Sequence, residues 1–468
     1  MSRFSRRSFL AGSAALIAAP AISATPGLED VDVVIVGAGA AGIAAARRLL
    51  AAKRSVAVFE ASNRVGGRCA TDKTFFGVPF DLGAHWIYNP ENSPLVAQVL
   101  ESGLDIYPAP RGQSLRIGAR NALDAEMENY LAGLVRAQRA IHDLGKLKAD
   151  VPAVRLLPPD LGDWRATIEF ILGPYALGKN LANVSAFDLA RAVPRESASF
   201  CRQGYGALLA ALAAGLPVKL ATPVTMIYWG GKSLIVETPK GDLRPRAVIV
   251  TVSTNMLTED KIEFIPPLPK RPLDAASRLS LGSFDHIALD LPGNPFGLQR
   301  DDLVFERPRG ERSAALLANV SGTGLHVVEL CGVAGRDLSA QGEAAMIEFA
   351  GEWLASLFGA SARRAIKRAR ATRWNAEPWV LGAMSAAAPG DAEARKILLE
   401  PVGERVWFAG EAVHETQWGT VNGAWESGER TAEMVLRTIG GARGEPKAPR
   451  HSKRTSQTSR KQRSRRSE

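Results

Sequence analysis

The segment from residue 31 to residue 60 constrains the fold of this 468-residue chain more than any other part of it. Val31 to Val36 is a β-branched run of the kind found in buried parallel strands. A turn with the sequence GAGAAG at 37–42 leads into a segment with helical periodicity, and a second strand from Val56 to Phe59 ends on Glu60. This order of elements, a strand, a turn, a helix and a second strand that ends on an acid, predicts a dinucleotide-binding unit.

Each position of the turn has a physical role in such a unit. Gly37 permits the tight turn, Gly39 lets the backbone approach a pyrophosphate, and Gly42 lets the helix pack close to the strand. Ala40 and Ala41 open the helix, where free N–H groups and the helix dipole favour an anion. The turn is therefore the predicted phosphate site.

Glu60 narrows the choice of dinucleotide. A carboxylate at the end of the second strand, with Ala61 beside it, is placed to accept both ribose hydroxyls of an adenosine. The same carboxylate would repel the 2′-phosphate of NADP, so FAD and NAD remain at this point.

The motifs that follow resemble those of one family. The pattern ExxxRxGGR from Glu60 to Arg68 and the stretch DLGAHWI at 81–87 resemble the flavin amine oxidases: monoamine and polyamine oxidases, L-amino-acid oxidases and flavin histone demethylases. The resemblance implies FAD as the cofactor, with Gly67 and Arg68 among its ligands and Arg68 reaching its phosphates. It also implies that a stretch of backbone faces the isoalloxazine ring: Gly83, Ala84, His85 and Trp86.

Two later blocks extend the resemblance. Residues 203–254 are similar to the second FAD-binding segment of the family, which implies that Val224 contacts the adenine through its backbone. Near the C-terminus, a strand ending in the AGE motif of Glu411 precedes a helix that opens near Thr420 and Val421. Glu411 is then an acceptor for the ribityl chain, and the helix N-terminus stabilises negative charge at flavin N1–C2=O during reduction.

These blocks predict an α/β fold in which a discontinuous Rossmann-type FAD-binding domain carries an inserted α+β substrate-binding domain. Helical periodicity at 124–147 and 344–358, and strand-like runs such as 284–290, predict a mixed lobe over the flavin. The predicted FAD-binding segments are residues 25–90, 201–268 and 400–442, and the predicted substrate-binding segments are residues 91–200 and 269–399.

The residue expected beside flavin N5 departs from the family pattern. Most amine oxidases of the family carry a lysine there, which holds a water molecule, whereas the corresponding stretch at 281–289 places His286 at that position. We predict that His286 is the catalytic residue, holding the same water and, with a pKa near neutrality, exchanging a proton. The alternative is a strand histidine satisfied by a neighbour.

The substrate pocket also departs from the family pattern. Monoamine oxidases bind FAD covalently through the cysteine of a Glu-Pro-Cys stretch, but Trp379 stands at that position, which predicts non-covalent FAD. Val380 and Thr420 align with the two rings that frame the amine, so that cage is absent. An electron-rich ring elsewhere would hold the amine, although ordinary packing is the alternative for each ring. The predicted substitutes are Trp379, Trp418, Tyr88 and Trp86.

The two ends of the chain carry its positive charge. Residues 1–24 contribute +3 and residues 445–468 contribute +7 of the net charge of +10, so the rest is neutral and indicates no nucleic-acid partner. Arg6 and Arg7 precede an uncharged, alanine-rich stretch, which predicts a twin-arginine signal peptide over residues 1–24, with a retained anchor as the alternative. After cleavage we expect a periplasmic protein without stable membrane insertion.

The basic tail, residues 443–468, is predicted to be disordered, either as a tether to anionic lipid or as a functionless extension.

Together these features predict an FAD-dependent amine oxidase. The C–H next to nitrogen of a small-molecule amine would give a hydride to flavin N5, water would hydrolyse the imine, and O₂ would accept the electrons, giving hydrogen peroxide. A flavin dehydrogenase or desaturase with a periplasmic electron carrier is one alternative. A non-catalytic FAD-binding interaction protein is another. No metal-ligand spacing occurs among the cysteines and histidines, and a homodimer remains open.

Overall fold

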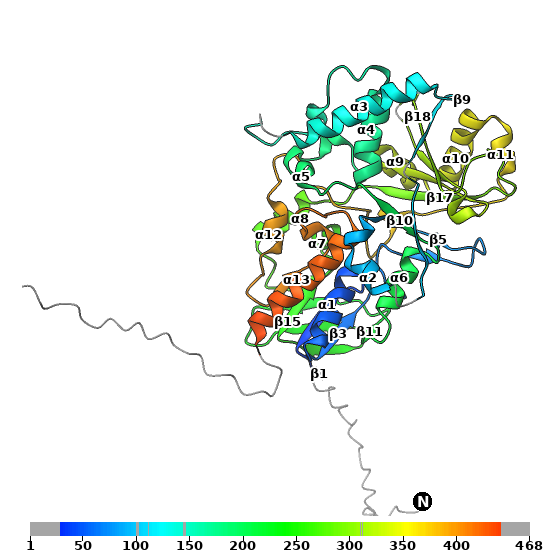
Figure 1. The fold of residues 1–468 in the computed structure, drawn as a ribbon. Coiled ribbons are helices and arrows are strands. Elements are labelled where there is room, and N and C mark those ends of the chain that lie inside the picture. Colours follow the sequence, from blue (N-terminus) through cyan, green and yellow to red (C-terminus); the bar gives the residue numbers. More distant parts are fainter. Residues whose placement is uncertain are drawn as a thin grey trace, which may run out of the picture.

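The structure is a computed structural model that describes residues 29–99, 103–110, 112–143, 147–308, 310 and 312–440. The predicted signal peptide and basic tail lie outside the described residues. The described chain forms two joined lobes, one built on a parallel sheet and one on a mostly antiparallel sheet (Figure 1). The prediction of an α/β fold is confirmed.

The parallel sheet has five strands, and all of them come from the three segments expected to bind FAD. Apart from the short edge strand β11, their residues are β-branched, aliphatic or aromatic and wholly buried, as expected of strands covered on both faces. The order across the sheet is β11 (Val218–Lys219), β3 (Val56–Phe59), β2 (Val33–Val36), β15 (Ala247–Val250) and β22 (Val406–Phe408).

Two helices cover one face of this sheet. Helices α1 (Ala40–Ala51) and α13 (Val421–Ile439), from opposite ends of the sequence, lie side by side (Figure 1). A Cβ added at Gly428 would lie 2.1 Å from the carbonyl oxygen of Ala41. Glycine at this position therefore permits the close approach that fixes the end of the chain against its beginning.

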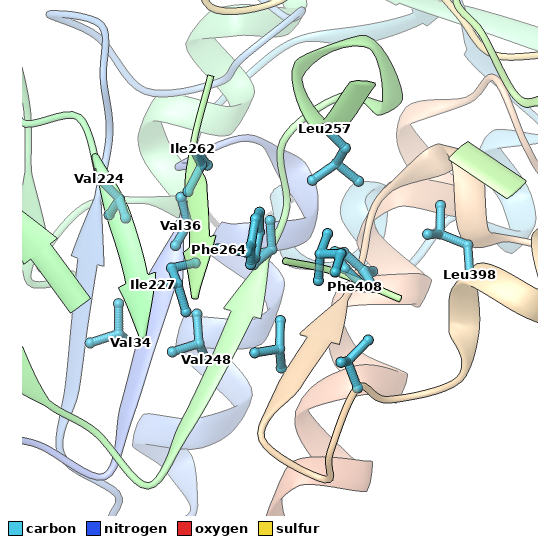
Figure 2. Close-up of a cluster of buried hydrophobic side chains, with 14 of the residues drawn as sticks. Val34, Val36, Val224, Ile227, Val248, Leu257, Ile262, Phe264, Leu398 and Phe408 are labelled. Atoms are coloured by element: carbon cyan, nitrogen blue, oxygen red, sulfur yellow. The ribbon is translucent and has the colours of Figure 1, made fainter. Parts of the chain in front are cut away.

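The other face of the sheet packs on a second sheet, which also has five strands (Figure 2). Because side chains alternate along a strand, Val33 and Ile35 point to the helices, whereas Val34 and Val36 enter the core between the two sheets. The strands of this sheet, in spatial order, are β1 (Glu29–Asp30), β14 (Gly241–Arg244), β13 (Ile235–Thr238), β12 (Met226–Tyr228) and β16 (Glu263–Ile265).

The same core also takes in segments that the sequence assigned to the substrate lobe. Helices α8 (Lys270–Arg278) and α12 (Ala394–Leu399) pack against each other beside α7 (Thr254–Thr258). Ala275 of α8 and Leu398 of α12 are buried in the core that holds the parallel sheet. The predicted domain boundaries at 268/269 and 399/400 therefore need correction, because apolar faces across these boundaries share one core.

The second lobe is built on a seven-stranded sheet with strands in the predicted substrate-binding segments. The strand predicted at 284–290 is β17, and the helix predicted at 344–358 is α10 (Glu343–Phe358). In spatial order the strands are β21 (Arg368–Ala371), β17 (Phe284–Asp290), β20 (Leu325–Cys331), β19 (Ala315–Ala318), β18 (Asp302–Glu306), β8 (Ser114–Ile117) and β9 (Arg120–Asn121).

Helices complete this lobe. Helix α10 packs with α9 (Gly332–Gln341) and α11 (Ser361–Ala365). A second helical group contains α3 (Asp124–His142), which is shorter than the predicted helix at 124–147. Its other members are α4 (Arg165–Phe170), a π-helical turn (Ile171–Tyr175) and α5 (Ala186–Arg191).

Among the described residues, no helix has both the length and the apolar character needed to cross a membrane.

The remaining elements of the two lobes are short strands and helices. They are β4 (Thr71–Asp72), β5 (Phe80–Asp81), β6 (Ile87–Tyr88), α2 (Pro94–Val99), β7 (Ile106–Pro108), β10 (Ala198–Cys201) and α6 (Tyr205–Leu212). Helices α2 and α6 share a core with α1 and α13.

Candidate active site

One elongated cavity runs from the glycine-rich turn of the parallel sheet to β17 of the substrate lobe. Of all the residues predicted from the sequence to contact cofactor or substrate, only Gly42 and Trp418 do not line it. The predicted residues that line it are Gly37, Gly39, Ala40, Ala41, Glu60, Ala61, Gly67, Arg68, Gly83, Ala84, His85, Trp86, Tyr88, Val224, His286, Trp379, Glu411, Thr420 and Val421.

The glycine turn forms the first end of the cavity. Gly37 has a φ of +105°, which favours glycine, and a Cβ at Gly42 would lie 2.0 Å from the carbonyl oxygen of Gly37. Gly39 precedes α1 without a side-chain cap, and a Cβ there would meet only Gly67, at 3.9 Å. Gly39 and Gly67 both border the cavity at the N-terminus of α1, where the free N–H groups and the open space fit a pyrophosphate.

Glu60 is held rigidly at the end of β3. Its Oε2 accepts a hydrogen bond of 2.8 Å from the backbone N–H of Ala38, and its Oε1 accepts one of 2.9 Å from that of Ser62. The carboxylate is buried and borders the cavity, so it fits the predicted role of ribose acceptor.

Arg68 and Glu411 form an ion pair across the middle of the cavity. Nη1 of Arg68 lies 2.8 Å from Oε1 of Glu411, and Oε2 accepts hydrogen bonds from the Ser385 hydroxyl and the Gly419 N–H. Burial raises the pKa of Glu411, but the charge of Arg68 and these hydrogen bonds outweigh it and hold the pKa below its ordinary value. Arg68 was predicted to reach the phosphates, and this stays a prediction; in this structure its guanidinium fixes Glu411 and lines the cavity.

The N-terminus of α13 borders the same region. The Thr420 hydroxyl caps the helix by accepting a hydrogen bond of 2.9 Å from the N–H of Gly423, and Thr420 and Val421 face the cavity. The helix begins at Val421, where the sequence indicated its N-terminus. This end of the helix fits a flavin carbonyl that gains negative charge on reduction.

His286 lies at the far end of the cavity. Its ring is buried, and Nδ1 donates a hydrogen bond of 2.7 Å to the backbone carbonyl of Asp81. Burial lowers its pKa to about 4, so the ring is neutral at physiological pH and Nε2 is an acceptor. The expected pKa near neutrality is therefore wrong, because the ring has almost no contact with solvent.

Sequence reasoning missed the acid next to His286. Glu329 occupies the position directly opposite His286 on β20, and its Oε1 lies 3.8 Å from Nε2 of the histidine. Glu329 is 1% exposed, and burial raises its pKa to about 7. Among the described residues Oε2 of Glu329 has no hydrogen-bond partner. The signal in the sequence was an acid inside the apolar stretch LHVVELC.

Three more polar groups converge on this acid. The Tyr175 hydroxyl and the Trp86 indole N–H approach Glu329 without reaching hydrogen-bond geometry. His85 donates from Nδ1 to Oδ2 of Asp81 at 2.9 Å, while its Nε2 has no partner among the described residues. Buried polar atoms left in this state are costly, so the region is built to receive hydrogen-bonding groups from water or a ligand.

The predicted aromatic residues occupy different places. Tyr88 lines the cavity, and Trp379 is at its rim with 37% exposure. Trp418 is buried in the helical core of the second lobe, under the guanidinium of Arg395 at 4.5 Å from its ring centre. The prediction that Trp418 binds substrate is therefore wrong, because packing and a stacked arginine cover it.

The fold and the cavity define the class of protein, a flavin-dependent oxidoreductase with FAD as its cofactor. A family model described as flavin containing amine oxidoreductase matches residues 40–436. The chain belongs to that family.

Curated relatives and solved structures agree with this assignment. The chain is 28% identical to lysine-specific histone demethylase 2 of Homo sapiens over 86% of its own length and 53% of the demethylase, so it spans about half of that relative. It is 26% identical to probable polyamine oxidase 4 of Arabidopsis thaliana, with 87% of each chain covered.

Two solved structures share the fold. A putrescine oxidase bound to putrescine superposes with a TM-score of 0.73 and 22% identity, over 87% of this chain and 99% of that one. Cyclohexylamine oxidase from Brevibacterium oxydans superposes with a TM-score of 0.72 and 20% identity, over 88% of this chain and 99% of the other.

Proposed function

We propose that this protein is an FAD-dependent amine oxidase that converts a small amine to an imine, which water then hydrolyses. The observation that carries the proposal is the single cavity that joins the predicted dinucleotide site to a buried end lined by His286, with Glu329 behind the imidazole. Bound FAD supplies a hydride acceptor at N5 and passes the electrons to O₂, giving hydrogen peroxide.

The walls of this buried end favour a neutral amine. Four aromatic rings line the cavity near His286 and reduce its contact with bulk water: those of Tyr175, Phe284, Trp86 and Tyr88. Desolvation penalises an ammonium more than an amine, so this end of the cavity lowers the pKa of a bound substrate. Only the neutral amine has the lone pair that assists departure of the hydride from the adjacent carbon.

The polar groups provide places for water and for a proton. Nε2 of His286 is free to accept a hydrogen bond because Nδ1 is committed to Asp81, so it orients a water molecule at the cavity wall. Ionised Glu329, behind the imidazole, is a stronger base than His286 and is the final acceptor for the ammonium proton. Tyr175 and Trp86 steady the carboxylate once it carries charge.

A second function keeps the cavity and changes the chemistry. Two departures from the family pattern favour a dehydrogenase or desaturase that passes electrons to a periplasmic carrier. His286 stands where most of the family has lysine, and Val380 and Thr420 replace the aromatic pair. Anaerobic mixing of the yellow protein with a panel of amines separates the two. Bleaching by amines followed by peroxide formation in air supports the oxidase, and bleaching only by non-amine reductants supports the alternative. No bleaching by any reductant would instead favour a non-catalytic FAD-binding protein.

We also propose export to the periplasm. The paired Arg6 and Arg7 before an uncharged stretch support a twin-arginine route, which carries proteins folded around their cofactor.

A further inference from the structure

Arg195 is a cavity-lining cation that the reaction above does not use. It lies on the loop between α5 and β10 and borders the cavity together with Tyr88, Tyr175 and Gly419. Tyr88 and Tyr175 belong to the substrate end of the cavity, whereas Gly419 lies just before α13 and donates its N–H to Glu411. A permanent positive charge at this place must affect which substrates enter.

The guanidinium is held in one position. Its Nη1 donates a hydrogen bond of 2.9 Å to the backbone carbonyl of Ala176, and its centre lies 4.6 Å from the centre of the Tyr88 ring. A Cβ built on Gly419 would lie 3.6 Å from Nη2, so the other edge of the fork faces the loop before α13. A guanidinium fixed in this way loses little further conformational freedom when it binds a ligand.

Arg195 has no acidic partner. Among the described residues no carboxylate lies within 4.0 Å of its nitrogens, whereas Arg68 in the same cavity is paired with Glu411. Arg202, stacked on Tyr107 at a similar 4.7 Å but outside the cavity, is paired with Asp105. An arginine that is positioned by a ring and a carbonyl and lacks a counter-ion is suited to an external anion.

The acids that line the cavity lie elsewhere. Glu60 is at the dinucleotide end, Glu411 is neutralised by Arg68, and Glu377 lies on the loop that leads to Trp379. Glu329 is behind His286 and does not line the cavity. Arg195 is therefore the permanent positive charge that lines the cavity beside Tyr88 and Tyr175, and Glu329, behind the cavity wall, is the acid that acts on both rings.

We propose that Arg195 binds a carboxylate carried by the substrate, so that the substrates are amines bearing a carboxylate, the class to which amino acids belong. The planar fork of arginine matches a carboxylate through two parallel hydrogen bonds. Diamines and polyamines, with a second positive charge, are repelled by the same group. Tyr175 and Phe284 receive the apolar part of the substrate. This inference names the substrate class for the proposed oxidase and rests on that function.

The experiment separates binding from turnover. The FAD-loaded protein is titrated with phenylpropionate, which has no amine to oxidise, and with phenylpropanol, its uncharged counterpart, and dissociation constants are taken from changes in flavin absorbance. Anaerobic flavin reduction is then compared for phenylalanine, for phenethylamine, which is the same molecule without the carboxylate, and for putrescine as a diamine.

Arg195→Gln removes the charge, Arg195→Lys keeps it without the fork, and Arg202→Gln is the matched control outside the cavity. We expect phenylpropionate to bind the wild type at least about tenfold more tightly than phenylpropanol, an advantage lost in Arg195→Gln and partly kept in Arg195→Lys. Phenylalanine should reduce the flavin faster than phenethylamine or putrescine, and Arg202→Gln should behave as wild type.

Equal affinity for acid and alcohol, a preference for the diamine, or an unchanged preference in Arg195→Gln would overturn the inference. If carboxylate binding depends on Arg195 but no amine reduces the flavin, the inference about Arg195 stands and the proposed oxidase activity fails. If amines reduce the flavin without regard to carboxylate or to Arg195, the oxidase stands and the inference fails.

Discussion

Oε1 of Glu329 lies 3.8 Å from Nε2 of His286, because the two residues are directly opposed in the antiparallel pair of β17 and β20. Burial acts on them in opposite directions, since it penalises whichever form is charged. It lowers the pKa of His286 to about 4 and raises that of Glu329 to about 7. The group that titrates near neutrality at this end of the cavity is therefore the acid and not the imidazole.

The rate of flavin reduction should rise as the pH passes through about 7, because Glu329 accepts a proton only when it is ionised. Stopped-flow reduction by a good substrate, measured across this range, should show the inflection in wild type and lose it in Glu329→Gln. Ionisation of the substrate amine adds a separate rise at higher pH. An inflection near 7 that persists in Glu329→Gln would assign it to another group.

Glu329 should also make the folded protein less stable as the pH rises. Its folded pKa lies above the ordinary value for glutamic acid, so between these two pH values the folded state holds a proton that the unfolded chain has lost. The free energy of unfolding therefore falls as the pH rises toward 7, and Glu329→Gln should flatten this part of the profile. Urea denaturation of wild type and variant in parallel measures the difference.

His286→Ala should retain FAD, because the ring contacts Asp81 and Glu329 and lies away from the glycine turn. Loss of the acceptor at Nε2 should slow flavin reduction or reoxidation by at least about tenfold. His286→Lys, which restores the residue usual in the family, should retain much of the rate. Wild-type rates in His286→Ala would leave this histidine a structural residue of β17.

Gly39→Val should abolish FAD retention while leaving the fold intact. Gly39 has an extended backbone, and an added Cβ would meet no atom closer than Gly67 Cα at 3.9 Å, so the valine side chain would occupy the cavity without disturbing the backbone. Gly42→Ala is the contrasting variant, because its Cβ would lie 2.0 Å from the Gly37 carbonyl oxygen and disturb α1 itself. Gel filtration with absorbance spectra and thermal melting distinguish loss of cofactor from loss of fold. A Gly39→Val protein that stays yellow would contradict the assignment of the glycine turn as the dinucleotide site.

Asp188→Asn should destabilise the protein by about 3–5 kcal/mol, because it leaves the buried Arg395 without its counter-ion. The two side chains meet through two contacts of 2.8 Å and are each 1% exposed. Glu400→Gln, which breaks the exposed pair with Arg271, is the control and should change the urea midpoint little. A small change in the free energy of unfolding in Asp188→Asn would mean that water reaches Arg395 in the folded variant.

Replacing Arg6 and Arg7 together with lysine should leave the precursor in the cytoplasm, since the pair is the predicted export signal. Fractionation followed by immunoblotting measures this, with wild type expressed in parallel. Normal periplasmic accumulation of the double variant would argue for another route.

Local sequence was sufficient to predict the cofactor end of the cavity. The order of β2, turn, α1 and β3 and the acid at Glu60 depend on near neighbours, because glycine positions and strand periodicity act over a few residues. The family motifs around Arg68 and Glu411 then located the remaining segments of the FAD-binding side.

The tertiary structure decided the chemistry at the other end. From the sequence, Trp418 and Tyr88 were equally plausible as substrate-binding residues. In the structure Trp418 is covered by Arg395, whereas Tyr88 borders the cavity beside Arg195. Glu329 meets His286 only because β20 pairs with β17 in one register, and both pKa values follow from burial. The sequence by itself determined the dinucleotide-binding turn, a strand, glycine turn and helix, since that turn depends on local backbone geometry. The charges that face the substrate end depend on long-range pairing and desolvation, which only the folded chain determines.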